Sequence, residues 1–519
     1  MLRGILTVGG WTMASRILGF VRDMLIAALL GAGPVADAFF MANRLPNLFR
    51  RLFGEGAFNA AFVPSFAGLL AAEGHAAAKS FAEQAIGVMA FWLVGITIAA
   101  ELFMPQVMAV VAPGFADMPE KFALAVELAR ITFPYMPLIC LTALLSGVLN
   151  GLDRFGAAAA SGLVYNVVSI GFMVGLLGVV PTAGHALAIG VSVSGVAQVA
   201  LVAWAVRLAG MRLHIPRPRL TPQMRLLLRR MAPGLFGAGV VQLNSVVDAI
   251  IGSLLAPGTV AVLYYADRVN QLPLGIIGTA VGTALLPTLS RQVRGGEAGD
   301  ALATLNRAVE YALLLTLPAA LALAVSAEPI ISVLFGRGAF NAHDVMFSAQ
   351  SLAAYAVGLP AFVLVKVLVP AFFARGDTSV PVKTGMAAVA LNLGLNVAFM
   401  APLQHLGPPL ASSIASWVNV VALCAILLRR GHMRLDAALC ARSLKMLAAG
   451  ALMATVLWLL QDRVFTAMEN LHGLRWLALA AIVSGGSAVY FAAGQMLGAF
   501  DMRTVMARLR RRRKLPASG

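Results

Sequence analysis

The sequence predicts an all-α polytopic membrane protein. Of its 519 residues, 60% are hydrophobic and only 12% are charged, and the mean hydropathy is +0.86. A soluble domain carries about twice that share of charge and cannot bury so much apolar surface. Apolar runs of about 20 residues, long enough to cross a ~30 Å hydrocarbon layer as a helix, recur from one end to the other. These observations exclude a soluble enzyme, a disordered chain and a secreted disulfide scaffold.

Fourteen membrane-spanning helices are predicted from the apolar windows between charged, glycine and proline residues. The first window resembles a signal peptide but has no small-residue cleavage site after it, so it is interpreted as the first span. An even number of spans places both termini on the same side. The predicted limits are 5–31, 34–53, 81–111, 122–149, 157–180, 185–208, 224–255, 259–289, 302–335, 344–374, 380–401, 408–430, 440–461 and 475–499.

Basic residues are concentrated in alternate loops. Segment 207–230 holds seven arginines, 291–307 three, 429–445 five basic residues, and the tail 501–519 seven. The intervening loops without any lysine or arginine lie near residues 32, 182, 257 and 404. Because basic loops are retained in the cytoplasm, this asymmetry predicts that both termini are cytoplasmic. It also accounts for the net charge of +17 without a nucleic-acid partner.

Two stretches of the chain resemble each other at an offset of about 225 residues. Segment 23–40 matches 248–265, and the segment around Pro137 matches the one around Pro360. The offset equals six spans, so the sequence predicts two parallel six-helix lobes with two extra helices at the C-terminal end, and a substrate site between the lobes. Chance similarity among alanine- and leucine-rich helices is the alternative. The predicted parts are an N-lobe, a C-lobe, spans 13 and 14, and a basic cytoplasmic tail, at 1–210, 211–431, 432–500 and 501–519 respectively.

Several charged residues fall inside predicted spans. A cation at mid-bilayer costs ~2.5–3.5 kcal/mol on insertion scales, so each must face a partner, water or a ligand. Arginine, with its planar fork, suits a phosphate group better than lysine does. The sequence therefore predicts a positive internal cavity. Its candidate binding residues are Arg16, Arg22, Arg50, Arg51 and Arg268, and its candidate gating or ion-pair residues are Asp23, Asp37, Glu55 and Asp267.

Helical periodicity constrains which of these charges can meet. Arg16 and Asp23 lie seven positions apart and share one helix face, whereas Arg22 lies about 120° away from both. Arg22 is therefore expected to join a common pocket only if the helix bends near Gly19. Arg268 belongs to the second repeat and approaches from the other lobe. Two alternatives stay open. The arginines pair only with neighbouring carboxylates, or the side chains of Arg50 and Arg51 extend to the membrane interface.

Motifs for catalysis, metal binding and ATP hydrolysis are missing from the sequence. There is no phosphate-binding G-x-x-x-x-G-K-[ST] loop and no H-E-x-x-H motif, and spacing singles out no Ser/His/Asp set. The three cysteines, Cys140, Cys424 and Cys440, are far apart and have no histidine or cysteine at ligand spacing. No catalytic residue, metal or cofactor is expected, and the protein is predicted not to be an enzyme.

Three segments make the chain similar to a known family. These are SRILGFVRD at 15–23, DAFFMANRLPNLFRRLFGEGAFNAAFVPSF at 37–66 and YYADRVNQLP at 264–273. With them, the chain resembles the MurJ (MviN) family of lipid II flippases, within the multidrug, oligosaccharidyl-lipid and polysaccharide exporters. The resemblance implies a bacterial inner-membrane protein that moves lipid II, an undecaprenyl-pyrophosphate-linked disaccharide-pentapeptide, to the outer leaflet by alternating access. It also implies contact with membrane lipid and suggests the cell-wall synthesis machinery as a partner.

The resemblance also implies roles for particular residues. Arg16, Arg22 and Arg268 correspond to the family's cavity arginines, and the arginine pair and the acid of DAFF become Arg50, Arg51 and Asp37. Spans 13 and 14 would form the groove for the polyprenyl tail. One departure is Gln271, which stands where some relatives carry an acid, so a gating or ion-coupling role implied for that acid is in doubt here.

Other functions fit the sequence less well. A flippase for another undecaprenyl-pyrophosphate-linked oligosaccharide would share the pyrophosphate and is the nearest alternative. An ion-coupled drug exporter would favour an acidic cavity for cationic drugs. A peptidoglycan polymerase would need catalytic carboxylates in a periplasmic region, but every predicted loop on that side is short. Cations inside the membrane are a costly feature for a purely structural scaffold.

Overall fold

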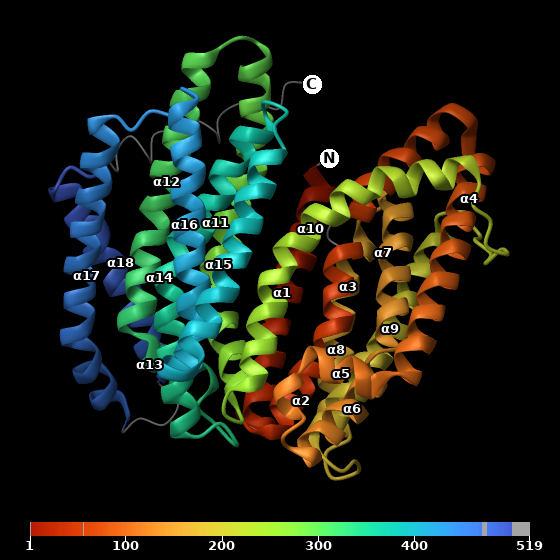
Figure 1. Cartoon of the computed structure of the whole chain (residues 1–519), viewed down its shortest axis with the longest axis horizontal. Coiled ribbons are helices and arrows are strands. Elements are labelled where there is room, and N and C mark those ends of the chain that lie inside the picture. The colour runs from red at the N-terminus through yellow and green to blue at the C-terminus, as the bar shows by residue number, and fades with distance from the viewer. Residues whose placement is uncertain (1, 55–56, 470–474, 501–519) are drawn as a thin grey trace. The chain divides into compact units, whose positions relative to one another are not determined.

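The computed structural model describes residues 2–54, 57–469 and 475–500, and within these ranges the regular structure is entirely helical (Figure 1). The predicted all-α class is therefore confirmed, whereas the predicted site residue Glu55 lies outside the described residues. In the described part of the chain, nine helical stretches are long and apolar enough to cross a membrane. Two of them, Pro119–Gly151 and Ser379–Arg429, each contain two α-helices. The count of fourteen spans stays a prediction.

The chain divides into two compact units. The first extends beyond the predicted N-lobe because α10 (Pro222–Leu254) packs against α4 (Ala57–Leu102) of the first unit. The repeat boundaries predicted after residues 210 and 431 stay predictions. The two compact units are defined by contacts between residues, whereas a repeat is defined by similarity between two parts of the sequence. Unit 1 comprises Met1–Val262 with Arg337–Asn341, and unit 2 comprises Leu263–Gly336 with Ala342–Gly519.

Unit 1 is a helical bundle around an aromatic core. Phe58, Phe62 and Phe66 follow each other at helical spacing on α4, so their rings stack at 5.2 and 5.8 Å, and Phe81 stacks on Phe62 at 5.5 Å. Leu144 and Val148 of α7 complete this core. Besides α10, the helices are α1 (Leu2–Leu30), α2 (Pro34–Ala42), α3 (Arg44–Gly54), α4 (Ala57–Leu102), α5 (Met104–Val111), η1 (Pro113–Phe115), α6 (Pro119–Thr132), α7 (Tyr135–Gly151), α8 (Gly156–Gly175) and α9 (Ala183–Leu208).

Unit 2 contains most of α11 and every later helix. The last two helices pack on α12, where the buried Tyr490 hydroxyl donates a hydrogen bond to the Leu314 carbonyl at 3.0 Å. This contact fixes α17 and α18 to the bundle. The helices are α11 (Thr259–Arg294), α12 (Ala298–Val325), α13 (Ala327–Phe335), α14 (Ala342–Phe373), α15 (Ser379–Leu403), η2 (Gln404–Leu406), α16 (Gly407–Arg429), α17 (Ala437–Glu469) and α18 (Arg475–Met496).

The predicted span 34–53 is two helices, α2 and α3, separated at Asn43. Pro46 explains the break, because it has no N–H to donate to the carbonyl of Ala42 four residues earlier. The Thr132 hydroxyl of α6 lies 3.3 Å from that carbonyl oxygen, and the Leu128 and Ala129 carbonyls of its own helix lie within reach of the same hydroxyl. The break therefore depends on a proline in the sequence and is stabilised by a neighbour that is distant in the chain.

The turns after α7 and α14 have equivalent hydrogen bonds at the offset of the predicted repeat. The Arg154 amide donates to the Leu149 carbonyl at 2.8 Å, and the Asp377 amide donates to the Phe372 carbonyl at 3.1 Å. Both bonds close the end of a helix in the same way. In the second turn the Arg430 guanidinium donates to the Asp377 carboxylate at 2.6 Å, which lowers the pKa of that carboxyl. These matched turns agree with the repeat alignment, which remains a prediction.

Candidate functional site

The predicted charges on α1 form an ion pair between adjacent residues. The Arg22 Nη2 atom lies 2.8 Å from Asp23 Oδ1, and the Asp23 side chain is fully buried. α1 runs as one helix from Leu2 to Leu30, and adjacent residues of a helix point to different faces. The long Arg22 side chain nevertheless turns back far enough for its guanidinium to reach Asp23. Arg16 is exposed, and its guanidinium has no ion pair or hydrogen bond within the described residues. The structure therefore pairs Arg22 with Asp23 and leaves Arg16 accessible.

An aromatic contact also holds Arg22. Its guanidinium carbon lies 5.0 Å from the ring centroid of Tyr165 on α8, within the range of a cation–π interaction. The Tyr165 ring in turn packs against the Tyr135 ring of α7 at 5.6 Å. The Tyr135 hydroxyl donates to Gln198 Oε1 of α9 at 3.3 Å. A continuous set of contacts from three helices thus positions one arginine, and none of these three polar partners was predicted from the sequence.

Asp37 on α2 occupies a second charged centre. Its Oδ2 atom lies 2.6 Å from Lys121 Nζ, and it accepts the amide hydrogens of Gly258 and Ala261 at 2.6 and 2.8 Å. Both amides lie at the N-terminal end of α11, where the helix dipole favours an anion. The Lys121 ammonium also lies 4.0 Å from the Phe115 ring centroid. Asp37 therefore joins α2, α6 and the start of α11 through one buried carboxylate.

Lys121 had no predicted role because it falls in a short loop in the sequence. One signal could have identified it, since the loops on that predicted side carry very few lysines and arginines. A lone lysine among them is a candidate partner for an acid in a neighbouring span. The structure pairs Asp37 with Lys121, and the predicted gating or ion-pair role of Asp37 remains a proposal.

The glycine next to this centre allows a close approach of two backbones. Gly258 has a φ of +92°, and a Cβ atom there would lie 2.2 Å from the carbonyl oxygen of Ala32. Only glycine combines that dihedral angle with that contact.

We expect Gly258→Ala to destabilise the protein by at least about 2 kcal/mol, because it combines a left-handed backbone with overpacking. The measurement is the thermal unfolding midpoint of the purified chain. Gly178→Ala is the matched control, since Gly178 has a φ of +80° but no atom within 4 Å of an added Cβ. An equal loss in the two variants would show that the contact with Ala32 contributes nothing.

The remaining predicted residues lie in other contacts. Arg50 Nε donates to Asn47 Oδ1 on the same helix at 3.3 Å, and Arg51 Nη1 donates to Gln242 Oε1 of α10 at 3.3 Å. Both arginines are partly buried. Asp267 accepts a hydrogen bond from Gln271, four residues later on α11.

Arg268 is also partly buried and belongs to unit 2, whereas Arg16 and Arg22 belong to unit 1. The convergence of these three arginines on one cavity stays a prediction.

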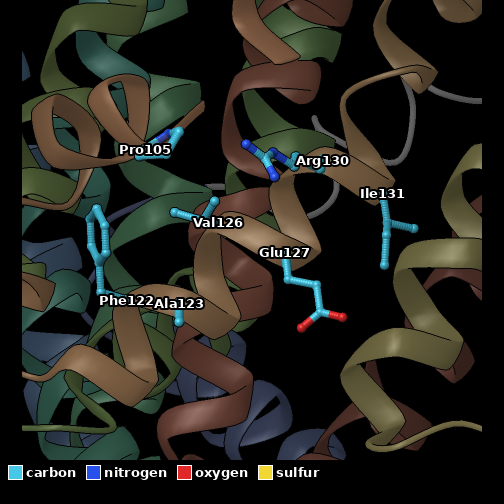
Figure 2. A pocket seen from close by; sticks show the side chains of 7 residues that line it. All are labelled: Pro105, Phe122, Ala123, Val126, Glu127, Arg130 and Ile131. Atoms are coloured by element: carbon cyan, nitrogen blue, oxygen red, sulfur yellow. The ribbon is translucent and has the colours of Figure 1, made fainter. Parts of the chain in front are cut away.

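A cavity of about 480 Å³ lies elsewhere in unit 1, between α5 and α6. Its lining is mostly apolar, and Figure 2 shows its two charged residues, Glu127 and Arg130, leaving α6 in different directions. Glu127 Oε1 lies 3.3 Å from His185 Nε2. None of the predicted site residues lines this cavity, and within the described ranges no group of His, Cys, Asp and Glu is arranged to hold a metal ion.

A bundle of long apolar helices with paired charges inside it defines a polytopic helical membrane protein, and charges in that position are typical of transport proteins. Residues 26–472 match the family model described as Lipid II flippase MurJ. The chain therefore belongs to the MurJ family.

Relatives and solved structures agree with this assignment. The probable lipid II flippase MurJ of Rhizobium tropici is 43% identical over 100% of this chain and 98% of its own length. The corresponding protein of Rhizobium meliloti (strain 1021) is 42% identical over 98% and 96%. A solved lipid II flippase MurJ in an inward closed conformation matches with a TM-score of 0.78 at 24% identity, over 94% of this chain and 98% of that one. An inward-facing multidrug MATE transporter matches with a TM-score of 0.63 at 15% identity, over 82% and 98%. The two structural matches concern the fold.

Proposed function

We propose that this protein is a lipid II flippase of the bacterial inner membrane, and that it moves the lipid-linked peptidoglycan precursor between the leaflets. Similarity to MurJ relatives over the whole chain carries the proposal. The charged centre on α1 supports it, because an arginine held by Asp23 and Tyr165 offers a preorganised fork for a pyrophosphate. Flipping breaks no covalent bond, so the proposed activity needs no catalytic residue.

The proposed mechanism is alternating access by two parallel six-helix lobes within a chain of fourteen spans, with both termini in the cytoplasm. Arg16, Arg22 and Arg268, with Arg50 and Arg51, bind the pyrophosphate of the headgroup. The polyprenyl tail stays in lipid along α17 and α18. Asp23 and Asp267, which adjoin Arg22 and Arg268 in the chain, are given the role of neutralising these two arginines when the ligand leaves.

Asp37 is proposed to act as a latch. Its contacts with Lys121 and with the first amides of α11 hold α2 and that helix end together on the predicted periplasmic side. Opening towards the periplasm would break these contacts. A buried ion pair suits a latch because it is costly to break halfway, so it favours two discrete states. The cell-wall synthesis machinery is the proposed recipient of the flipped precursor.

The test uses Arg16→Ala, Arg22→Ala and Arg268→Ala in cells depleted of their own lipid II flippase. Each variant is expected to reach the membrane at a normal level and to fail to restore growth, with lipid II headgroups accumulating on the cytoplasmic side. Arg154→Ala is the control, because Arg154 is exposed in the turn after α7. Normal growth of the three variants would contradict the assigned residues. Failure of the unchanged protein to restore lipid II export, with rescue of another lipid-linked oligosaccharide, would contradict the substrate.

A further inference from the structure

The segment that joins α9 to α10, residues 209–221, is extended and fixed along α4 at the edge of unit 1 (Figure 1). The His214 amide donates to Glu83 Oε1 at 3.0 Å, and the Thr221 hydroxyl donates to Gln84 Oε1 at 2.7 Å. A Cβ atom on Gly87 would lie 2.7 Å from the Pro216 carbonyl oxygen, so the backbones are in close contact. These contacts hold the segment in one place, and we call it the strap.

The first turns of α10 continue this surface. Met224, Leu227 and Met231 are buried in the core of unit 1 at a spacing of three and four residues. Leu226 and Leu228, which flank Leu227 on its two sides, are 48% and 42% exposed. Figure 1 shows this part of α10 beginning beside α4 and crossing one end of unit 1. One face of these first turns of α10 therefore packs against the core of unit 1, and the rest of the helix surface is exposed.

Six arginines lie on the strap and on the uncovered face of α10. All six are exposed, and within the described residues none of their guanidinium groups has an ion pair or hydrogen bond. The Glu83 carboxylate, which contacts the strap, lies 3.3 Å from His214 Nδ1 and 3.6 Å from Lys79 Nζ. We call this set the arginine surface, and its members are Arg212, Arg217, Arg219, Arg225, Arg229 and Arg230.

Aliphatic side chains alternate with these arginines. Ile215 and Leu220 on the strap are 71% and 51% exposed, in addition to the two leucines of α10. Arginine next to exposed isoleucine and leucine suits the headgroup region of a bilayer, where the guanidinium meets phosphate and the aliphatic group enters the acyl boundary. A surface that faced only water would gain nothing from these four aliphatic side chains.

We propose that the arginine surface binds the headgroups of anionic glycerophospholipids in the leaflet that it faces. Bidentate contacts from arginine to phosphate give the surface its preference for these lipids. The bound lipids hold the strap and the first turns of α10 on the membrane surface. This role differs from the topological role of basic loops, which requires positive charge but no particular surface.

The test measures retention of phosphatidylglycerol against phosphatidylcholine by native mass spectrometry of the purified full-length chain. The variant Arg217→Gln/Arg219→Gln/Arg225→Gln/Arg229→Gln is expected to lose at least tenfold in phosphatidylglycerol retention, because several cation–phosphate contacts are removed together. The matched control is Arg291→Gln/Arg294→Gln/Arg429→Gln/Arg434→Gln, which removes the same charge from exposed positions of unit 2 and is expected to retain the lipid. Equal losses in the two variants, or no preference for phosphatidylglycerol in the unchanged protein, would overturn the proposal.

A second variant keeps the test valid if the glutamine variant does not insert. Ile215→Ser/Leu220→Ser leaves every charge in place, so membrane topology is unaffected. It is expected to lower phosphatidylglycerol retention about three- to tenfold, because two aliphatic contacts with the acyl boundary are lost. Unchanged retention in this variant would show that the aliphatic side chains are not part of the surface, against the proposal.

Discussion

Replacing Lys121 with methionine is expected to destabilise the protein by about 3–5 kcal/mol, because the Asp37 carboxylate then stays buried without its cation. The two side chains are only 4% and 1% exposed, so water cannot replace the ammonium group. Methionine keeps nearly the same length and volume, so packing against Phe115 is retained and the change isolates the charge. The measurement is the thermal unfolding midpoint of the purified full-length chain in detergent, together with its growth-supporting activity.

A matched control for this prediction is Lys79→Met. Lys79 lies 3.6 Å from Glu83 on an exposed surface of α4, and a pair of this kind contributes less than about 1 kcal/mol. The double variant Lys121→Met/Asp37→Leu removes both charges and is expected to recover only part of the loss, because the amides of Gly258 and Ala261 then have no acceptor. If the free energy of unfolding of Lys121→Met lies within about 0.5 kcal/mol of that of the unchanged protein, the prediction is wrong. The amides at the start of α11 would then be enough to stabilise the buried Asp37 carboxylate.

Replacing Tyr165 with leucine is expected to lower lipid II transport about tenfold or more. A desolvated cation–π contact contributes about 2 kcal/mol, and each 1.4 kcal/mol corresponds to a factor of ten. The Arg22 guanidinium lies 5.0 Å from this ring, so without it the arginine loses this support while Asp23 remains. The prediction rests on Arg22 binding the pyrophosphate. The measurement is the rate of lipid II movement in proteoliposomes at several substrate concentrations.

Two further variants separate positioning from general packing. Tyr165→Phe keeps the ring and is expected to retain transport, because no hydrogen bond of the Tyr165 hydroxyl is present within the described residues. Phe91→Leu changes an aromatic residue that is 61% exposed on α4 and is expected to have no effect. A leucine variant at Tyr165 that transports normally would exclude the ring as a support for Arg22.

The charged centres show how far helical periodicity can predict a site. Periodicity identified Arg22 and Asp23 as charges inside a span but placed them on different faces, so Arg22 was expected to join a common pocket only if α1 bent, and its pairing with a neighbouring carboxylate was left as an alternative. The helical wheel follows the direction of each Cβ atom, whereas the flexible arginine side chain can turn back to an adjacent carboxylate. The same limit applies to Arg51, whose partner Gln242 lies 191 positions away on α10.

Pro46 illustrates a local feature that the sequence contained but the predicted spans did not use. A proline without a hydrogen-bond donor must end or bend a helix, and α2 ends four residues before it. The predicted span 34–53 was defined by hydropathy, which does not register a missing donor. The resulting break is what brings the Ala42 carbonyl within reach of Thr132.

By itself, the sequence determined the class of protein, the all-helical fold and the family, because total hydrophobicity, charge content and the motif residues are properties of the chain and need no geometry. It also determined which charges lie inside apolar helices. Only the tertiary structure decided which partner each charge has: Asp37 meets Lys121 84 positions away and α11 221 positions away, and Arg22 meets Tyr165. The physical reason is that periodicity determines the face on which a side chain lies, whereas its partner depends on the packing and rotation of separate helices. In an apolar environment a charge without a partner is costly, so this packing decides where a buried charge is stable.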